Sequence, residues 1–334
     1  MAKIMFFAHD PGGANAILPL IEPLEKENEV FVFAKGPALL KLPNPKILEE
    51  NTLKIVNPDF LITGTSASDM TEKLLWQDSK DLNIKSMAIL DHWVNYGIRF
   101  SKYGLNEIEK FDKKCEFLPD YIIVMDEFAK QEMIKDGVPA EIIYPLGNPH
   151  FENLLRQSKN VKNVRSKFAK KNEFLITFAS EPYTEDYGQG NEKKVLEDLI
   201  HIAKDKNIKI IVKLHPKEDF SKYSEFKNVM FDKETAPTEV IMASDLIVSM
   251  TSMFLLEAMI LGKNILSYQP NETNPDKFIL TRNKMLPFVK NKEDFKEKIL
   301  NILNGKRYLQ YNQSIEFDAV EKIIKFISEE LCRK

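Results

Sequence analysis

Short runs of apolar residues alternate along this chain with segments in which apolar positions recur every three or four residues. The runs predict strands, and the wider spacing predicts helices. In the first half, strands are expected at residues 3–9, 29–35, 60–65, 86–93, 120–126 and 141–149, with helices at 16–27, 47–59, 70–83 and 127–139. Strands that alternate with helices are typical of βαβ units in a parallel sheet.

The second half shows the same alternation. Strands are expected at residues 174–180, 209–215, 229–232, 245–250, 264–268 and 285–289, with helices at 192–207, 237–244 and 252–262 and two more at the carboxyl end. Gly147, Asn148 and Pro149 interrupt the pattern between the halves, which places a domain boundary near residue 155. We therefore predict an α/β protein with two doubly wound, Rossmann-like domains, residues 1–155 and 156–334, whose last helix can pack back on the first domain.

Composition supports two soluble domains and limits the choice of partners. The 334 residues exceed what one core usually holds, and 43% hydrophobic and 29% charged residues suffice to fill and solvate two cores. The net charge of -3 argues against a nucleic-acid partner. Residues 159–171 carry six basic residues and no acid, which could contact an anionic membrane, although a solvated linker is the simpler interpretation.

Cysteine usage and hydropathy indicate the compartment. Cys115 and Cys332 are isolated and have no metal-type spacing, as fits a reducing cytosol. No window reaches the roughly 18 uninterrupted apolar residues of a membrane span. We expect a cytoplasmic protein, with peripheral contact at the inner face of the membrane as a further option.

Polar residues follow two strands of the second half. His215 ends the strand 209–215 before Pro216, and Ser249, Thr251 and Ser252 lie where the strand 245–250 turns into a helix. Parallel strands collect their carboxyl ends at one ligand-binding edge, so these side chains are expected in one cleft. A histidine there can donate to a phosphate oxygen or only to its own loop, and the hydroxyls can cap the helix or help free amides to bind a phosphate.

Three acidic or hydroxyl residues belong to the same predicted edge. Ser180 and Glu181 end the first strand of the second half, and Glu257 lies on the helix 252–262 among apolar residues. A carboxylate on a buried helix needs a partner, and a ribose hydroxyl would serve. No Asp-x-Asp pair occurs in the chain, so we favour a reaction that does not depend on a metal ion.

The loop after the first strand contains Asp10, Gly12 and Gly13. It lacks the glycine spacing of dinucleotide and P-loop motifs, so its glycines indicate only that a ligand or the other domain approaches the backbone closely. Asp10 is a candidate general base, and a helix N-cap is the structural alternative.

A second candidate base follows another strand of the first half. Asp91 stands at the end of the strand 86–93 with His92 and Trp93, and Thr65 ends the strand 60–65. Asp91 could deprotonate an acceptor hydroxyl, and Trp93 could stack on a sugar ring, although tryptophan is more often a core residue. Asp10 and Asp91 remain alternatives for the base.

These features resemble glycosyltransferases of the GT-B fold along nearly the whole chain. His215 with Pro216 and the turn Ser249–Ser252 are similar to motifs of bacterial sialyltransferases, Kdo transferases and CDP-glycerol polymerases, in which the matching residues bind the donor's nucleotide phosphate. The segments PDFLITGTSASD, SMAILDHW and IIYPLGNPHFENL also look like the UDP-N-acetylglucosamine 2-epimerase family, which shares the fold. That family expects His-x-Glu-Ala-Gly where this chain has Asp91-His92-Trp93, and the sialyltransferases expect an acidic pair before a glycine that is absent here.

The resemblance implies an inverting, metal-independent glycosyltransferase. It would move a sugar from a nucleotide-linked donor, with a CMP-linked acidic sugar favoured, to a cell-surface glycan or glycolipid precursor, and it would need no cofactor besides that co-substrate. The alternatives are a UDP-sugar 2-epimerase or hydrolase and a CDP-glycerol-type glycerophosphotransferase. The expected donor-binding residues are Ser180, Glu181, His215, Pro216, Ser249, Thr251, Ser252 and Glu257, with His215 also stabilising the leaving group. The expected acceptor-binding residues are Gly12, Gly13, Thr65, His92 and Trp93, with Asp10 or Asp91 as base.

Overall fold

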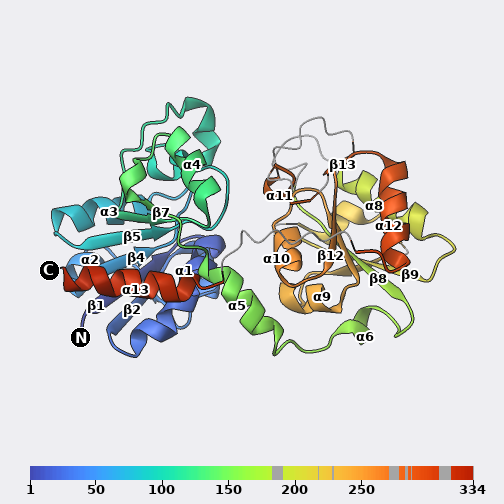
Figure 1. Ribbon diagram of the computed structural model, residues 1–334, viewed down its shortest axis with the longest axis horizontal. Helices are drawn as coiled ribbons and strands as arrows, with labels where there is room; N and C mark the ends of the chain where they lie inside the picture. Colours follow the sequence, from blue (N-terminus) through green and yellow to red (C-terminus); the bar gives the residue numbers. More distant parts are fainter. Residues whose placement is uncertain are drawn as a thin grey trace. The chain divides into compact units, whose positions relative to one another are not determined.

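The computed structural model describes residues 1–182, 191–216, 218–227, 229–270, 278–282, 285–286, 288–307 and 317–333. The chain divides into two compact units (Figure 1). Unit 1 comprises Met1–Asn153 together with Gln313–Lys334, and unit 2 comprises Leu154–Asn312. The chain therefore leaves unit 1 once and returns to it for its last helix.

Unit 1 is built on a parallel sheet of seven strands in the order β3-β2-β1-β4-β5-β6-β7. The strands are β1 (Lys3–Ala8), β2 (Glu29–Ala34), β3 (Lys46–Ile47), β4 (Phe60–Thr63), β5 (Lys85–Ile89), β6 (Tyr121–Ile123) and β7 (Ile143–Tyr144). The order reverses between β1 and β4, which pair with Phe7 opposite Thr63. This point of reversal is where open α/β sheets bind ligands.

Most helices of unit 1 connect these strands, and the last helix joins them from the end of the chain. They are α1 (Pro11–Glu25), α2 (Thr52–Val56), α3 (Thr71–Asp81), α4 (Glu127–Lys135) and α13 (Ala319–Cys332), with short 3-10 turns η1 (Gly36–Leu40), η2 (Gly97–Phe100), η3 (Leu105–Lys110) and η4 (Ala140–Ile142). Helix α5 (Pro149–Ser158) contains the boundary between the units. Helix α1 begins at Pro11 because a proline at the first helical position loses no intrahelical hydrogen bond.

The core of unit 1 lies on both faces of its sheet. Ile4, Phe6 and Ile62 point to the face that α1 and α13 cover. Trp76 of α3 lies on the other face, where its indole nitrogen donates to Thr63 Oγ1 at 2.9 Å and its ring stacks on Phe100. Alternate residues of each strand are thus buried on opposite faces, which explains the continuous apolar runs in the sequence.

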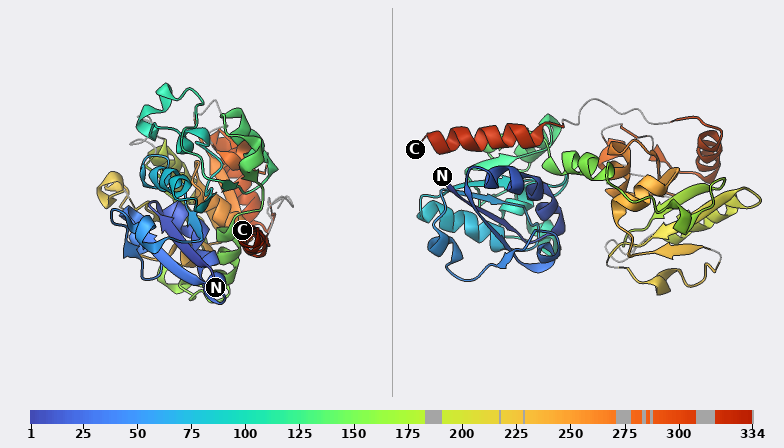
Figure 2. Two further views of the ribbon diagram at one scale, coloured as in Figure 1. Left: turned by 90° about the vertical axis from the view of Figure 1, so that its left-hand side faces the viewer. Right: turned by 90° about the horizontal axis from the view of Figure 1, so that it is seen from below.

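Helix α13 is held in unit 1 by apolar and polar contacts. Ile323 and Ile327 are buried with the side chains of α1, and the two helices lie side by side in Figures 1 and 2. The Glu330 carboxylate accepts a hydrogen bond from the Tyr121 hydroxyl and pairs with Lys85 Nζ at 3.1 Å. Residues from the end of the chain therefore complete the core of the amino-terminal unit.

Unit 2 repeats the architecture with six parallel strands in the order β10-β9-β8-β11-β12-β13. Its strands are β8 (Phe174–Ala179), β9 (Ile208–Lys213), β10 (Met230–Asp232), β11 (Leu246–Ser249), β12 (Asn264–Tyr268) and β13 (Phe288–Val289). Its helices are α6 (Arg165–Phe168), α8 (Glu192–Ala203), α9 (Pro237–Ala243), α10 (Phe254–Ile260), α11 (Ile279–Arg282) and α12 (Lys292–Leu303), with the 3-10 turn η5 (Phe220–Tyr223). Here the strand order reverses between β8 and β11.

Helices cover both faces of the unit 2 sheet as well. Phe178 and its neighbours pack against α8 and α12, through Leu196 and Phe295 among others. Leu175 points to the opposite face and packs against α6 and α9. Each unit thus has its own core, as two independent doubly wound domains require.

The predicted fold class is confirmed, and one predicted element is wrong. The helix expected over residues 47–59 is a short strand, β3, followed by the five-residue helix α2. Asn51 and Asn57 flank α2 with φ of 62° and 44°, a left-handed conformation that a continuous helix does not contain. Within the described ranges, no helix is long and apolar enough to cross a membrane.

Candidate functional site

The turns after β1 and β4 touch each other at the point where the unit 1 strand order reverses. A Cβ atom on Gly64 would lie 2.6 Å from the Gly13 Cα, and one on Gly13 would lie 3.0 Å from the Gly64 Cα. Neither position has room for a side chain. A close approach at Gly13 is thus made by the backbone at Gly64 of the same unit.

The carboxylate of Asp91 leaves no room for a side chain at position 12. A Cβ on Gly12 would lie 1.8 Å from Asp91 Oδ2, so this oxygen rests against the glycine at the start of α1. The other oxygen, Oδ1, accepts a hydrogen bond of 2.8 Å from Arg99 Nη1. Asp91 is thus fixed at both of its oxygens.

Arg99 holds Asp91 and Thr65 together at this edge of the unit 1 sheet. It was not among the site residues predicted from the sequence. Its Nη1 donates to the carbonyl oxygen of Thr65 at 2.7 Å and to Thr65 Oγ1 at 2.9 Å, besides Asp91. The side chains of Arg99 and Asp91 are 7% and 19% exposed. Thr65, expected to contact an acceptor, is buried and holds the arginine instead.

His9 and Asp10 form a second group at the same edge. The ring Nδ1 of His9 lies 2.8 Å from Asp10 Oδ1, and its Nε2 lies 3.5 Å from Asp69 Oδ2. The imidazole therefore bridges two carboxylates. Asp10 precedes α1 without capping it, and its side chain is 39% exposed. A ligand can therefore reach this side chain.

Glu72 lies behind this group in the first turn of α3. Its Oε1 accepts a hydrogen bond of 3.0 Å from the His9 backbone N–H, and its Oε2 has no partner among the residues described. Burial raises the pKa of Glu72 to about 7; the negative charges of Asp10 and Asp69 add to the rise, and the His9 N–H opposes it. A carboxyl group at the ligand edge therefore titrates near neutral pH.

Replacing Glu72 by glutamine should change how stability depends on pH. Because the folded-state pKa is raised, folding favours the protonated form, and the wild type loses stability as pH rises from about 4.5 to above 7. The Glu72→Gln variant lacks that loss and should be more stable at high pH by roughly 3 kcal/mol. Urea unfolding at several pH values measures the difference. Equal stability of the two proteins at every pH would contradict the assignment.

His92 and Trp93 occupy different environments from those expected of an acceptor site. Trp93 is buried, stacks on Phe151 with ring centres 5.6 Å apart, and donates to Asp126 Oδ2 at 2.9 Å. One face of its ring is therefore covered by protein, as in the core alternative. His92 is half-buried next to Asp91.

In unit 2, the turn expected to bind a phosphate holds a carboxylate of the protein itself. Glu181 Oε1 accepts from Met250 N at 3.0 Å, Thr251 N at 2.8 Å and Ser249 Oγ at 3.0 Å, and Oε2 accepts from Thr251 Oγ1 at 2.6 Å. Burial raises the pKa of Glu181, although these four donors oppose the rise. The expectation that the amides of this turn are free is wrong, because a carboxylate offers the oxygen acceptors that a phosphate would.

His215 and Ser180 are tied to a buried ion-pair network beside this turn. The backbone N–H of His215 donates to Glu218 Oε2 at 3.0 Å, and Ser180 Oγ donates to Glu218 Oε1 at 2.9 Å. Lys222 Nζ lies 2.6 Å from Glu218 Oε1 and 2.8 Å from Glu192 Oε1. The network fixes the backbone at the ends of β8 and β9, while the His215 side chain remains partly exposed and Pro216 is exposed.

Ser252 and Glu257 complete the predicted donor residues. Ser252 Oγ accepts from Phe254 N at 3.2 Å, but the residue that caps α10 is Met253, without a side-chain hydrogen bond. Glu257 is half-buried in α10. Three of the eight residues expected to bind the sugar donor are joined by direct hydrogen bonds, because Glu181 accepts from Ser249 and Thr251. Ser180 and His215 are linked because each donates to Glu218.

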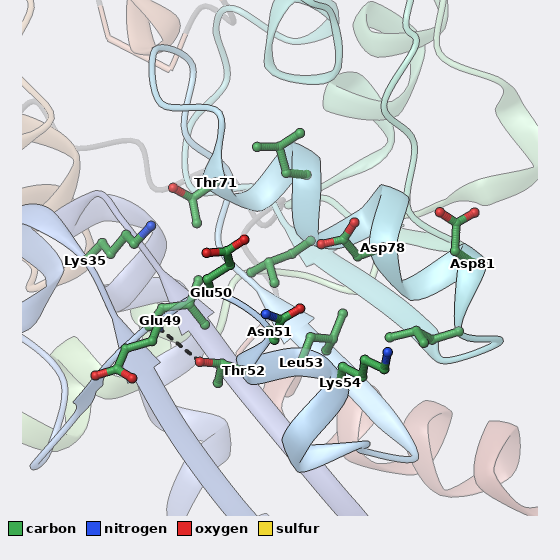
Figure 3. A pocket seen from close by; sticks show the side chains of 14 residues that line it. Lys35, Glu49, Glu50, Asn51, Thr52, Leu53, Lys54, Thr71, Asp78 and Asp81 are labelled. Carbon is green, nitrogen blue, oxygen red and sulfur yellow. Dashed lines mark hydrogen bonds between the residues drawn. The ribbon is translucent and has the colours of Figure 1, made fainter.

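Two further features bear on ligands. A hollow of about 530 Å³ lies in unit 1 between α2 and α3, where Figure 3 shows Glu49, Glu50, Asp78 and Asp81 around it with Lys35 and Lys54. None of the predicted site residues lines it. Among the residues described, no group of three or more His, Cys, Asp or Glu side chains is arranged to hold a metal ion.

Comparison with protein families decides the family of the chain. The model of DUF354, described as a protein of unknown function, matches residues 113–333. The chain belongs to this family. The matched span includes all of unit 2 and α13, and so the ion-pair network and the Glu181 turn lie within the part that defines DUF354. No curated protein matches the sequence.

Solved structures match this DUF354 protein over its whole length. UDP-GlcNAc 2-epimerase from Methanocaldococcus jannaschii has a TM-score of 0.72 at 17% identity, covering 98% of this chain and 99% of that one. UDP-GlcNAc 2-epimerase from Neisseria meningitidis, bound to UDP-GlcNAc, has a TM-score of 0.69 at 15% identity, with 98% and 100% covered. Anabaena HepE, in complex with UDP and glucose, has a TM-score of 0.59 at 16% identity, with both chains covered fully at 100%. At such identities the likeness shows the fold, which is the two-domain GT-B type.

Proposed function

We propose that this protein is an inverting glycosyltransferase that uses a nucleotide-linked sugar, with Asp10 as the general base. The observation that carries the proposal is the difference between the two carboxylates at the unit 1 edge. Asp91 is held by Arg99, rests on Gly12 and is 19% exposed, whereas the Asp10 side chain is 39% exposed and keeps a hydrogen bond to His9. An inverting transfer needs one base beside the acceptor hydroxyl, and Asp10 supplies it.

The proposed reaction displaces the nucleotide from the donor sugar. Asp10 takes the proton of the acceptor hydroxyl as that oxygen attacks the anomeric carbon of the donor. The bond from that carbon to the phosphate oxygen breaks, and the leaving nucleotide keeps the electron pair. His215 and the Ser249–Thr251 turn are the groups that we assign to its negative charge. No step in this scheme needs a resident cofactor.

Binding of the donor phosphate requires Glu181 to leave the turn. The Met250 and Thr251 amides and the Ser249 and Thr251 hydroxyls that hold the Glu181 carboxylate are also suitable donors to phosphate oxygens. Two anions cannot share these donors. We therefore assign Glu181 as an internal competitor for the donor phosphate.

The Glu181→Ala variant should bind the donor nucleotide about tenfold more tightly than the wild type, because it removes this competitor. Isothermal titration calorimetry with the nucleotide measures the change. Glu297→Ala, at an exposed position of α12, is the matched control and should leave the affinity unchanged. Weaker binding by Glu181→Ala would show instead that the carboxylate itself contacts the donor.

A second function is favoured by the structural neighbours. Several of them are UDP-GlcNAc 2-epimerases, and an epimerase would use Asp10 to remove a proton from a ring carbon of the sugar. The two functions differ in their need for an acceptor. An epimerase or hydrolase turns over the nucleotide-linked sugar alone, and an epimerase in heavy water introduces deuterium into the sugar ring.

Incubation with CMP-, UDP-, GDP- and CDP-linked sugars tests the proposal. We expect at least one donor to raise the melting temperature, and free nucleotide to appear once a cell-envelope glycan and glycolipid extract is added as acceptor. Turnover without the extract would support the epimerase or hydrolase. If no donor raised the melting temperature, both functions would be excluded.

A further inference from the structure

The amino-terminal edge of the unit 2 sheet, opposite to the strand ends that carry the predicted site, is rich in lysine. Residues 167–173 precede β8, and residues 204–209 lead into β9. These two segments contain two acids, Glu173 and Asp205, and six lysines, namely Lys167, Lys170, Lys171, Lys204, Lys206 and Lys209. All of these lysines except Lys206 are exposed. We call the two segments together the lysine edge.

The two segments of the lysine edge lie against each other. Phe174 N donates to the carbonyl oxygen of Asn207 at 2.8 Å, which joins the loops where β8 and β9 begin. Glu173 is turned inward and is 14% exposed. Its Oε2 accepts from Lys170 N at 2.6 Å, and its Oε1 lies 4.0 Å from Lys209 Nζ. The lysine edge thus carries an excess of positive charge that its own acids do not balance.

An apolar hollow opens beside these lysines. Strand β9 pairs with β8 from Ile208 onward but with β10 only from Ile211, so no described strand covers the β10 side of residues 208–210. The hollow at this place has a volume of about 490 Å³. Its charged lining residues are Lys204 and Lys209, and its other lining residues are apolar, among them Ile200, Ile208, Ile210 and Met230. Met230 is 44% exposed at the start of β10.

A second hollow of about 410 Å³ extends this surface along α8. It is lined by Glu197, Ile200, His201, Lys204 and Phe226, and it shares Ile200 and Lys204 with the first hollow. Apolar side chains between exposed ammonium groups suit a partner that is anionic at its surface and apolar beneath it. A bilayer with anionic lipids has both properties, whereas a soluble phosphate needs the ammonium groups alone.

We propose that the lysine edge and its apolar hollow form a docking surface for a bilayer that contains anionic lipids. The ammonium groups contact lipid phosphates, and Met230 with the aliphatic rim of the hollow reaches the boundary of the acyl chains. Because the Glu181 turn follows the carboxyl ends of the same strands, docking by the amino-terminal edge leaves that turn uncovered. The inference does not depend on the proposed function, since docking needs neither a sugar donor nor an acceptor.

Flotation of the full-length protein with lipid vesicles tests the charged part of this surface. Vesicles of phosphatidylcholine with about 30% phosphatidylglycerol should bind the protein, vesicles of phosphatidylcholine alone should not, and added salt should weaken the binding. Lys170→Gln/Lys204→Gln should bind about tenfold to thirtyfold more weakly, because each lysine near an anionic surface adds roughly a factor of five. Lys80→Gln/Lys296→Gln, at exposed positions of α3 and α12, removes the same charge and should bind as the wild type does.

The apolar part of the surface is tested with a separate pair of variants. Met230→Gln should bind the anionic vesicles about threefold to tenfold more weakly, because the side chain no longer gains from contact with acyl chains. Met242→Gln, at a position of α9 that is 36% exposed and does not line either hollow, is the matched control and should bind normally. Hydrogen exchange locates the contact, and residues 204–211 should exchange more slowly when the vesicles are bound.

Three results would overturn the inference. They are equal binding to neutral and anionic vesicles, undiminished binding by Lys170→Gln/Lys204→Gln, and undiminished binding by Met230→Gln, which would leave a purely ionic surface open to any polyanion. Melting temperatures equal to that of the wild type show that a loss of binding is not a loss of folding. The nucleotide panel is independent of the vesicles, so a failure of docking leaves the proposed function intact, and a failure of that function leaves docking intact.

Discussion

Asp10→Asn should lower the turnover of the nucleotide-linked sugar by about a hundredfold to ten-thousandfold, the usual contribution of a general base. Asparagine keeps the size of the side chain and can still meet His9 Nδ1, but it cannot take a proton from the acceptor. The side chain of Asp10 is partly exposed and does not cap α1, so the fold should be retained. Nucleotide affinity should also be retained, because the donor is assigned to unit 2.

Single-turnover kinetics with saturating donor measure this loss directly. Asp81→Asn, at an exposed position near the end of α3, is the matched control and should behave as the wild type does. If Asp10→Asn kept the full rate, Asp10 would not be the base. The carboxylate–imidazole pair at the unit 1 edge would then be structural.

Asp91→Asn should act on stability, and we expect it to lower the free energy of unfolding by about 3 kcal/mol. The change leaves the buried guanidinium of Arg99 without its counter-charge, and breaking one half of a buried pair costs more than the pair contributes. Urea unfolding of unit 1, followed by tryptophan fluorescence, measures the loss. Both tryptophans of the chain, Trp76 and Trp93, lie in this unit.

A double variant tests the cause of that loss. Arg99→Met removes the charge together with its hydrogen bonds, so Asp91→Asn should cost much less in an Arg99→Met protein than in the wild type. Additive losses would show that the two side chains do not depend on each other. If Asp91→Asn were as stable as the wild type, the structural role of Asp91 would be contradicted. Asp91 would then again be a candidate for the general base.

The strands could be predicted because each unit buries its sheet on both faces. β1, β4 and β8 consist mainly of apolar residues for this reason, and the helices between the strands show a three-to-four spacing. The segment around α2 could not be predicted in the same way. The apolar spacing of this segment fits a helix. Two asparagines in left-handed conformation limit the helix to five residues, and the sequence alone does not show that these asparagines adopt that conformation.

Residues at the ends of strands could be placed at the ligand edge, but their partners could not be identified. Asp10, Asp91, Ser180 and Glu181 stand there because parallel strands share one direction. Arg99 follows Thr65 by 34 residues, and Glu72 follows His9 by 63. Such contacts depend on how two loops pack, which a single sequence does not encode as a spacing.

One available signal was missed for Glu72. The helix over residues 70–83 was predicted to follow a strand, so its first turn had to lie at the ligand edge, and Glu72 is an acid in that turn. Its burial could not be foreseen. The occupation of the phosphate turn by Glu181 was equally hidden, because the same hydroxyls and amides suit either anion.

Phosphorus-31 NMR of the donor tests the central claim, chemistry on a nucleotide-linked sugar at Asp10, most directly. The wild-type protein, a donor that stabilises it and the cell-envelope extract are mixed, and the sugar-linked phosphate resonance is followed over time. Our account predicts that this resonance is replaced by that of the free nucleotide, and that it persists with Asp10→Asn. An unchanged spectrum for every donor with the wild type, or equal conversion by Asp10→Asn, would contradict it.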